Sequence, residues 1–210
     1  MKVGFLHVGE DTELVNGMVA SVRNVMPGAS VWMMTDGDTP EIDCDHRVQS
    51  PQDVPFMTYR MRHLAALPPG KWVILDTDVI VQRTLEGVLG KHDACLTRRE
   101  MVLDQDGNNV AEWMPYNTGV MWCRNPEFWR DAYKVCTKLP DKLQNWYGDQ
   151  VAVRLVAESG RYKIGEVNVD PWNYSPEYAD EDISTKAVVH YKGRRKDWMR
   201  KRCHSLLTPS

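Results

Sequence analysis

Two aspartates separated by one residue, Asp76 and Asp78, have the types and spacing best suited to chemistry in this sequence. They directly follow the apolar run 72–75, and carboxylates so close together repel each other unless a cation lies between them. Mn²⁺ and Mg²⁺ favour carboxylate oxygens and leave positions open for substrate phosphates. The pair therefore predicts a site where a metal ion neutralises charge on a leaving diphosphate. Two solvated loop aspartates are the alternative interpretation.

His190 is the candidate for a third metal ligand. It ends the short apolar run 188–190, and a neutral imidazole nitrogen can join two carboxylates around one ion. Just downstream, Gly193 lets the backbone approach a phosphate, and Lys196 supplies a positive charge to it. A purely structural histidine is the alternative. The sequence thus places a candidate phosphate-binding segment beside a candidate metal ligand.

Asp149 and Gln150 form a second candidate pair. They follow Gly148 at the expected start of a helix, where they could hold sugar hydroxyls and stabilise an oxocarbenium-like transition state. The alternative for Asp149 is an ordinary helix N-cap, which stabilises a helix by roughly 1 kcal/mol. We take both residues as candidate catalytic residues.

The elements that must position these side chains alternate in type through the first half. Apolar runs predict strands at 2–8, 31–34 and 72–75, and helical spacing of apolar residues predicts helices at 15–26 and 57–64. Such alternation predicts a mostly parallel central sheet with helices on both faces, an α/β fold of Rossmann-like type.

Ligands of open parallel sheets bind at the carboxyl ends of the strands. Asp36 and Asp76 fall at such ends. We therefore add Asp36 to the candidate residues that bind a nucleotide donor, and we name His7, in the first predicted strand, as a further candidate.

The second half is less regular. The predicted elements are a hairpin at 101–110 that turns at Asp106 and Gly107, a strand at 119–123, helices at 126–139 and 149–159, and a late strand at 188–190 that returns to the sheet. No internal repeat or linker interrupts the chain. We expect one domain at 1–198 and a basic C-terminal tail at 199–210.

Composition sets further bounds. The 210 residues include five cysteines without a C-x-x-C pair, which favours a reduced compartment, and no apolar run approaches the ~18 residues that span a bilayer. We therefore expect a cytoplasmic protein with no transmembrane segment.

Among the tryptophans, we expect Trp113 in the core and Trp146 in an acceptor cleft. We expect the turn-rich segment 169–174 to form an acceptor loop.

The segment 192–202 carries seven cations against Asp197 alone, in a chain whose net charge is −3. Such a cluster can serve a phosphate, a nucleic acid or an anionic surface, and a solvated basic tail is the alternative.

Four segments in this order resemble the GT-A fold glycosyltransferases, and among them the family of glycogenin and the bacterial lipopolysaccharide galactosyltransferases. They are Trp72-Val73-Ile74-Leu75-Asp76-Thr77-Asp78-Val79-Ile80-Val81 with its D-x-D motif, Tyr116-Asn117-Thr118-Gly119-Val120-Met121, Gly148-Asp149-Gln150, and His190-Tyr191-Lys192-Gly193-Arg194-Arg195-Lys196-Asp197-Trp198. Asp197 replaces the proline of the family's closing motif, which puts the conformation of that last loop in question.

The resemblance implies a metal-dependent glycosyltransferase that moves a sugar from a nucleotide-sugar, a UDP-sugar in particular, with retention of anomeric configuration. It implies Mn²⁺ or Mg²⁺ as cofactor, held by Asp76, Asp78 and His190, and Gly193 and Lys196 at the donor diphosphate. The further donor-binding residues that it implies are Asn117, Gly119 and Arg60, with Arg62 as the rival of Arg60.

Other functions remain open at this point. The first strand–helix junction lacks G-x-G-x-x-G, and the P-loop motif is absent, which disfavours dinucleotide oxidoreductases and P-loop enzymes. A nucleotidyltransferase that makes an activated sugar would use the same carboxylates and metal. A nucleic-acid-binding protein would act through 192–202, and a transferase that glycosylates nucleic acid would combine the two. The acceptor is a glycan, lipid, protein or nucleic acid.

Overall fold

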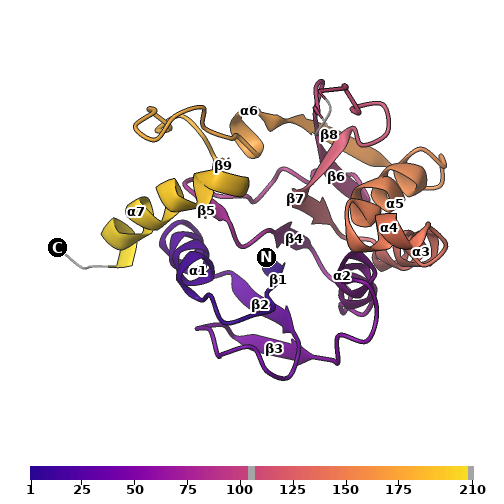
Figure 1. Cartoon of the computed structure of the whole chain (residues 1–210), viewed down its shortest axis with the longest axis horizontal. Helices are drawn as coiled ribbons and strands as arrows, with labels where there is room; N and C mark the ends of the chain where they lie inside the picture. The colour runs from indigo at the N-terminus through magenta and orange to yellow at the C-terminus, as the bar shows by residue number, and fades with distance from the viewer. Residues whose placement is uncertain (104–106, 208–210) are drawn as a thin grey trace.

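The computed structural model describes residues 1–103 and 107–207, which build a seven-stranded sheet between two layers of helices (Figure 1). Across the sheet, the strands are β3 (His46–Gln49), β2 (Ser30–Thr35), β1 (Lys2–Leu6), β4 (Trp72–Leu75), β7 (Tyr116–Cys123), β6 (Ala94–Arg98) and β8 (Ile164–Asn168). Strands β3, β6 and β8 are additions to the predicted set.

The sheet is mostly parallel, as predicted. β3, β2, β1 and β4 pair in parallel, and β6 pairs in parallel with β8. Only β7 runs against its neighbours β4 and β6. Helices α1 (Glu13–Val25) and α2 (Phe56–Ala65) return the chain so that β1, β2 and β4 run parallel, whereas β3 follows β2 through a loop without a helix.

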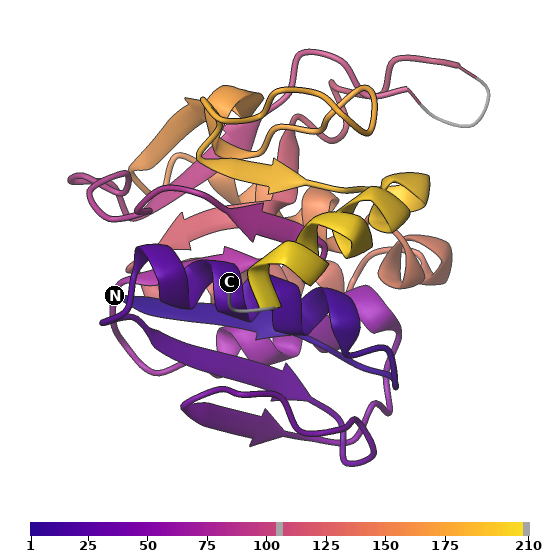
Figure 2. The same ribbon diagram turned by 90° about the vertical axis from the view of Figure 1, so that its left-hand side faces the viewer.

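The two faces of the sheet bury two separate apolar cores. Along β4, Val73 and Leu75 point into one core, and Trp72 and Ile74 point into the other. The first core lies under α1 and α7 (Lys196–Leu207); the second lies under α2, α3 (Pro126–Cys136) and α5 (Gly148–Ala157) (Figures 1 and 2). The short α4 (Asp141–Asn145) packs on α2 and α5 and buries no residue in this core. Both faces are therefore covered, as the sequence pattern predicts.

A two-stranded ribbon beside the main sheet corrects one prediction. β9 (Val188–His190) pairs antiparallel with β5 (Val79–Val81), so the prediction that 188–190 returns to the sheet is wrong. Both edges of β4 are already taken by β1 and β7, so the chain after Asp78 leaves the sheet and needs another partner. The short α6 (Val169–Trp172) and the 3₁₀ turn η1 (Gly193–Arg195) flank β9 in sequence.

Residues 199–207, expected as a basic tail, form most of α7 and pack on α1. Met199 and Cys203 are fully buried there. A Cβ atom at Gly17 would lie 2.1 Å from Cys203 Sγ, so this contact between the helices depends on glycine.

The predicted hairpin pairs as expected, with Val110 N donating to Val102 O at 2.7 Å; its turn at Asp106 lies outside the described residues. The prediction that Trp113 lies in the core is wrong, because the side chain is 67% exposed beyond this hairpin. Among the described residues, every helix is too short or too polar to cross a bilayer.

Candidate active site

Asp76, Asp78 and His190 come together at the carboxyl end of β4. His190 Nε2 lies 3.0 Å from Asp78 Oδ1 and 3.6 Å from Asp76 Oδ2. One ligand atom from each residue falls within 4.8 Å of the others, which is a spacing that a single metal ion can bridge. Residues 114 positions apart in sequence thus meet as the sequence analysis predicted.

The β5–β9 ribbon fixes this meeting. In the register of this ribbon, Val79 lies opposite His190. Asp78, directly before β5, and His190, the last residue of β9, therefore lie at the same end of the ribbon. Tyr191 N donates to Asp78 O at 2.8 Å, and His190 N donates to Tyr174 O at 2.6 Å. The backbone therefore holds both ligands before any ion binds.

Asn173 orients the imidazole. Its Oδ1 lies 2.8 Å from His190 Nδ1, and its amide nitrogen donates to Thr97 Oγ1 at 3.3 Å, so Nδ1 carries the proton. Nε2 then presents its lone pair to Asp76 and Asp78. A histidine ligand held through its second nitrogen is the usual arrangement at metal sites, so these residues fit a divalent cation.

Gly119 leaves the room that this cluster needs. A Cβ atom there would lie 2.2 Å from His190 Cε1 and 2.8 Å from Asp76 Oδ2. Asn117 Oδ1 accepts from Gly119 N at 2.8 Å, and Asp76 N donates to Gly119 O at the same distance. In this structure Asn117 and Gly119 therefore support the metal ligands from β7.

Arg60 ties the cluster to the helix layer. Its guanidinium donates to Asp76 Oδ1 at 2.8 Å, to Asp149 Oδ2 at 2.6 Å and to Thr118 O at 2.8 Å. Burial opposes its charge, but the two carboxylates outweigh burial and raise the pKa of Arg60. Arg62, the rival from sequence, points away and donates to Asp53 and the Pro51 carbonyl.

Asp149 lies behind Arg60 and is only 2% exposed. Its carboxylate accepts from Arg60, from Thr118 Oγ1 at 2.7 Å and from Gln150 N at 2.8 Å. Gln150 Oε1 accepts from Arg99 Nη2 at 2.5 Å. The enclosed Asp149 is thus placed to hold Arg60.

Lys196 approaches the cluster from the start of α7. Its Nζ lies 3.5 Å from Asp78 Oδ2. Burial alone would raise the pKa of Asp78, but His190 and Lys196 outweigh it and lower the pKa to about 2. Gly193 has a φ of +59°, a conformation that glycine adopts without strain, at the turn that brings Lys196 back.

Asp36 lies at the end of β2, as expected, and His7 lies at the end of β1. His7 is buried, its Nε2 has no partner among the described residues, and burial lowers its pKa. Asp36 accepts from Thr39 Oγ1 at 2.6 Å and lines a pocket of about 510 Å³ beside the end of β3. This pocket lies on the β2–β3 side, apart from the metal ligands.

One pocket is lined by residues of the cluster, and a second is lined by Asn173, the partner of His190. The first, of about 320 Å³, is lined by Asp76, Asp78, Arg60, Lys196 and Trp146 among others. Trp146 is 62% exposed there. That it lines an acceptor cleft stays a prediction.

The other pocket, of about 570 Å³, lies toward β6, β8 and the segment after α6. Asn173, Arg99 and Lys192 line it. Burial, and then repulsion from Arg99, lower the pKa of Lys192 to about 8, while burial lowers the pKa of Arg99 to about 10. Sequence reasoning missed Asn173 and Arg99 as site residues, and only the expected acceptor loop at 169–174 pointed to this region.

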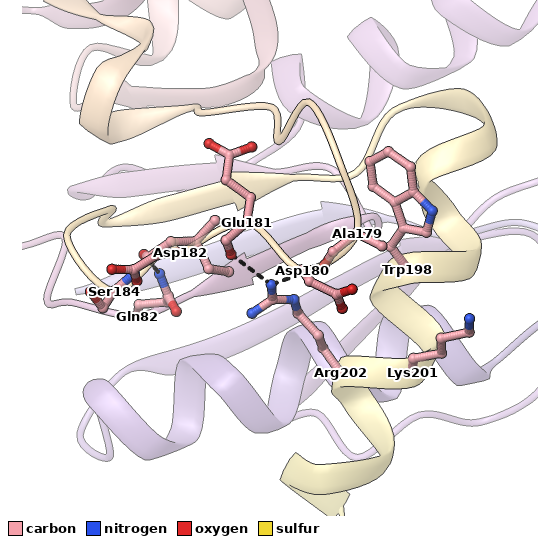
Figure 3. Close-up of a pocket in the computed structure, with 10 residues that line it drawn as sticks. Gln82, Ala179, Asp180, Glu181, Asp182, Ser184, Trp198, Lys201 and Arg202 are labelled. Carbon is pink, nitrogen blue, oxygen red and sulfur yellow. Dashed lines mark hydrogen bonds between the residues drawn. The ribbon is translucent and has the colours of Figure 1, made fainter.

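Most cations of the basic segment have partners within the protein. Arg200 pairs with Asp11 and Glu13, and Arg195 Nε donates to Pro176 O at 2.6 Å. Arg202 donates to the Ala179 and Glu181 carbonyls beside a pocket of about 620 Å³ (Figure 3). This pocket is lined by loop 179–184 and α7, away from the metal ligands.

No protein-family sequence model and no curated protein sequence matches this chain. Solved structures do. The glycosyltransferase GlyE of Streptococcus pneumoniae TIGR4 superposes with a TM-score of 0.66 at 13% identity, over 99% of this chain and 60% of GlyE.

The galactosyltransferase LgtC, solved in complex with donor and acceptor sugar analogues, superposes with a TM-score of 0.65 at 14% identity over 100% of this chain and 98% of LgtC. A glycosyltransferase involved in glycosylation of the major capsid of PBCV-1 gives a TM-score of 0.65 at 12% identity over 97% of this chain and 98% of that one. The chain spans about three fifths of GlyE and nearly all of the other two. With its D-x-D motif at the end of β4, the chain has the GT-A fold of these glycosyltransferases.

Proposed function

We propose that this protein is a metal-dependent glycosyltransferase that uses a nucleotide-sugar donor, a UDP-sugar in particular. The observation that carries the proposal is the Asp76–Asp78–His190 cluster, oriented by Asn173 and placed at the carboxyl end of β4. Ligands of open α/β sheets bind at this edge. The GT-A fold shared with GlyE and LgtC supports the same assignment.

Asp76, Asp78 and His190 would hold Mn²⁺ or Mg²⁺. The bound ion would neutralise charge on the leaving diphosphate. On the protein side, Lys196 lies against Asp78 and would add a cation beside the same diphosphate, while the turn at Gly193 would let the backbone approach it.

Of the remaining residues, some would hold the metal ligands in place and one would contact the donor sugar. Arg60 and Asp149 form a buried ion pair, so we assign them to holding Asp76 in place. Asn117 supports Gly119 in the same way from β7. Gln150, at the start of α5, is the residue that we assign to the donor sugar.

His7 and Asp36 would bind the base and ribose end of the donor. A buried imidazole with an unpartnered nitrogen and a pocket of about 510 Å³ at the ends of β2 and β3 support this placement. The preference for uridine and the retention of anomeric configuration rest on the resemblance to the lipopolysaccharide galactosyltransferase family.

The acceptor would enter from the side opposite the diphosphate. The pocket with Lys196 and Trp146 and the pocket with Lys192 and Asn173 flank the same cluster. We therefore assign the first to the donor and the second to the acceptor, which would place Trp146 beside the donor and not in the acceptor cleft that we expected for it. Arg195 in η1 and Arg200 and Arg202 in α7 bind within the protein, which argues against a role of these three arginines in binding a large polyanion.

Thermal unfolding with UDP-galactose and UDP-glucose, in Mn²⁺ and in chelator, tests the proposal. Either ligand should raise Tm in Mn²⁺ only, because binding to the native state alone stabilises it by mass action. Asp78→Asn should abolish the shift, and Asp180→Asn, on the distant loop beside α7, should keep it. Equal protection in chelator, or release of pyrophosphate in place of UDP during turnover, would contradict the proposal.

A further inference from the structure

Arg99 is a half-buried cation whose hydrogen-bond partners are all neutral, and Asp149, which pairs with Arg60, attracts it only from beyond salt-bridge distance. Its Nη2 donates to the carbonyls of Met114 and Tyr116 at 2.7 and 3.0 Å and to Gln150 Oε1. Its Nε is buried and has no hydrogen-bond partner among the described residues. A guanidinium normally pairs with a carboxylate or phosphate when it leaves water, so this arrangement is costly as it stands.

Lys192 is a second half-buried cation in the same pocket. Both side chains line its wall. The carboxylates of Asp76 and Asp78 pair with Arg60, His190 and Lys196. Among the described residues, no carboxylate lies within salt-bridge distance of Arg99 or Lys192, so the wall of the pocket holds two cations without an anionic partner.

The other charged residues of the pocket do not neutralise the positive charges of Arg99 and Lys192. Arg98 pairs with Glu166 at 2.9 Å, and Lys186 pairs with Asp170 at 2.6 Å. Glu100 is exposed, so water and salt screen its charge far more than the charges of the half-buried pair.

We propose that the acceptor of this glycosyltransferase carries an anionic group, a carboxylate or a phosphate, which binds between Arg99 and Lys192. The inference rests on the proposed function, because it takes this pocket as the acceptor side of the metal cluster. Asn173 lines the pocket and also holds His190, so an anion bound there lies beside the reaction centre. A neutral acceptor would leave both half-buried cations without a counter-charge.

Matched acceptor probes test this on the full chain. Methyl β-D-glucopyranoside, methyl β-D-glucuronide and methyl β-D-glucoside 6-phosphate differ only at C6, and they separate neutral, carboxylate and phosphate groups. Binding of each is measured by saturation-transfer NMR with Mg²⁺ and UDP at saturating concentration, so that the donor side is filled. At least one anionic probe should bind about 10-fold more tightly than the neutral one, as expected for a charged group that gains two half-buried cationic partners.

The double substitution Arg99→Gln with Lys192→Gln should reduce that preference to about one. Arg98→Gln is the matched control, because Arg98 is the neighbouring arginine in the same pocket but already has Glu166 as its partner. It should leave the preference unchanged. Equal or absent binding of all three probes would overturn the inference, and so would a preference that survives the double substitution.

The donor experiment keeps the two proposals separate. If UDP raises Tm only with Mn²⁺ and the probes show no preference for an anion, the anionic acceptor is wrong while the transferase proposal stands. If UDP gives no metal-dependent shift, the transferase proposal fails first.

Discussion

The two sides of the Asp76–Asp78–His190 cluster differ in how their charges are balanced. On the α2 side, Arg60 is buried between the carboxylates of Asp76 and Asp149. On the β6–β9 side, Arg99 and Lys192 face a pocket without a carboxylate partner within salt-bridge distance among the described residues. A charge that is already paired supports the fold, whereas an unpaired one leaves free energy to be gained from a ligand.

The largest effect should come from removing the paired cation. We expect Arg60→Gln to lower the free energy of unfolding by about 3–5 kcal/mol, because it leaves the buried Asp149 charge without compensation. Urea unfolding monitored by circular dichroism measures this.

Arg62→Gln is the control on the same helix, since its partner Asp53 lies at the surface. Its effect should be much smaller. If both variants lost similar free energies of unfolding, the buried ion pairs of Arg60 would stabilise the fold no more than a surface ion pair does.

His63 on α2 should make stability depend on pH. Burial, with a smaller contribution from Arg62, lowers its pKa to about 4. Between pH 6.5 and about 4 the unfolded chain therefore binds a proton that the native state does not, and stability falls as pH falls. The loss should reach about 2–3 kcal/mol near pH 4 after allowance for solvent screening.

His63→Gln should flatten this part of the stability curve, and His46→Gln, on the exposed edge strand β3, should keep it. Chemical denaturation at several pH values gives the comparison. An unchanged slope in His63→Gln would assign the pH dependence to other groups.

On the opposite side, Asn173→Ala should weaken metal binding by about 10–100-fold, because the imidazole loses the partner that fixes its proton. Titration of Mn²⁺ followed by electron paramagnetic resonance measures the affinity. Asn173→Asp keeps an oxygen acceptor and should retain most of it. Equal loss in both variants would point to a packing role for Asn173.

The smallest effect should come from the surface of α7. Arg200→Ala removes the ion pairs with Asp11 and Glu13 and should cost about 0–1 kcal/mol, less at high salt. Thermal unfolding of the variant and the unchanged protein at two salt concentrations measures this loss and its dependence on salt. A loss of more than about 2 kcal/mol in the free energy of unfolding would show that these ion pairs stabilise the fold more than exposed pairs do.

Sequence alone predicted the regular part of the fold and named the three residues of the cluster, Asp76, Asp78 and His190. The run that ends at Asp76 is a buried strand, and apolar spacing sets the helices α1 and α2, because both signals are local. The pairing of β9 with β5 was not predicted, because it depends on contacts distant in sequence: β1 and β7 occupy both edges of β4. Arg99 and Asn173 gave no local signal, because their importance comes from contacts with Gln150 and His190 across the fold.

The β5–β9 ribbon also sets when the cluster can exist during protein synthesis. Asp76 and Asp78 leave the ribosome more than one hundred residues before His190, while β1, β2 and β4 can already pair. Only when β9 emerges and aligns with Val79 does the third ligand reach the other two. A nascent chain can therefore hold most of its sheet and still be unable to retain a metal ion, so binding competence arrives only after β9 has been made and has paired with β5.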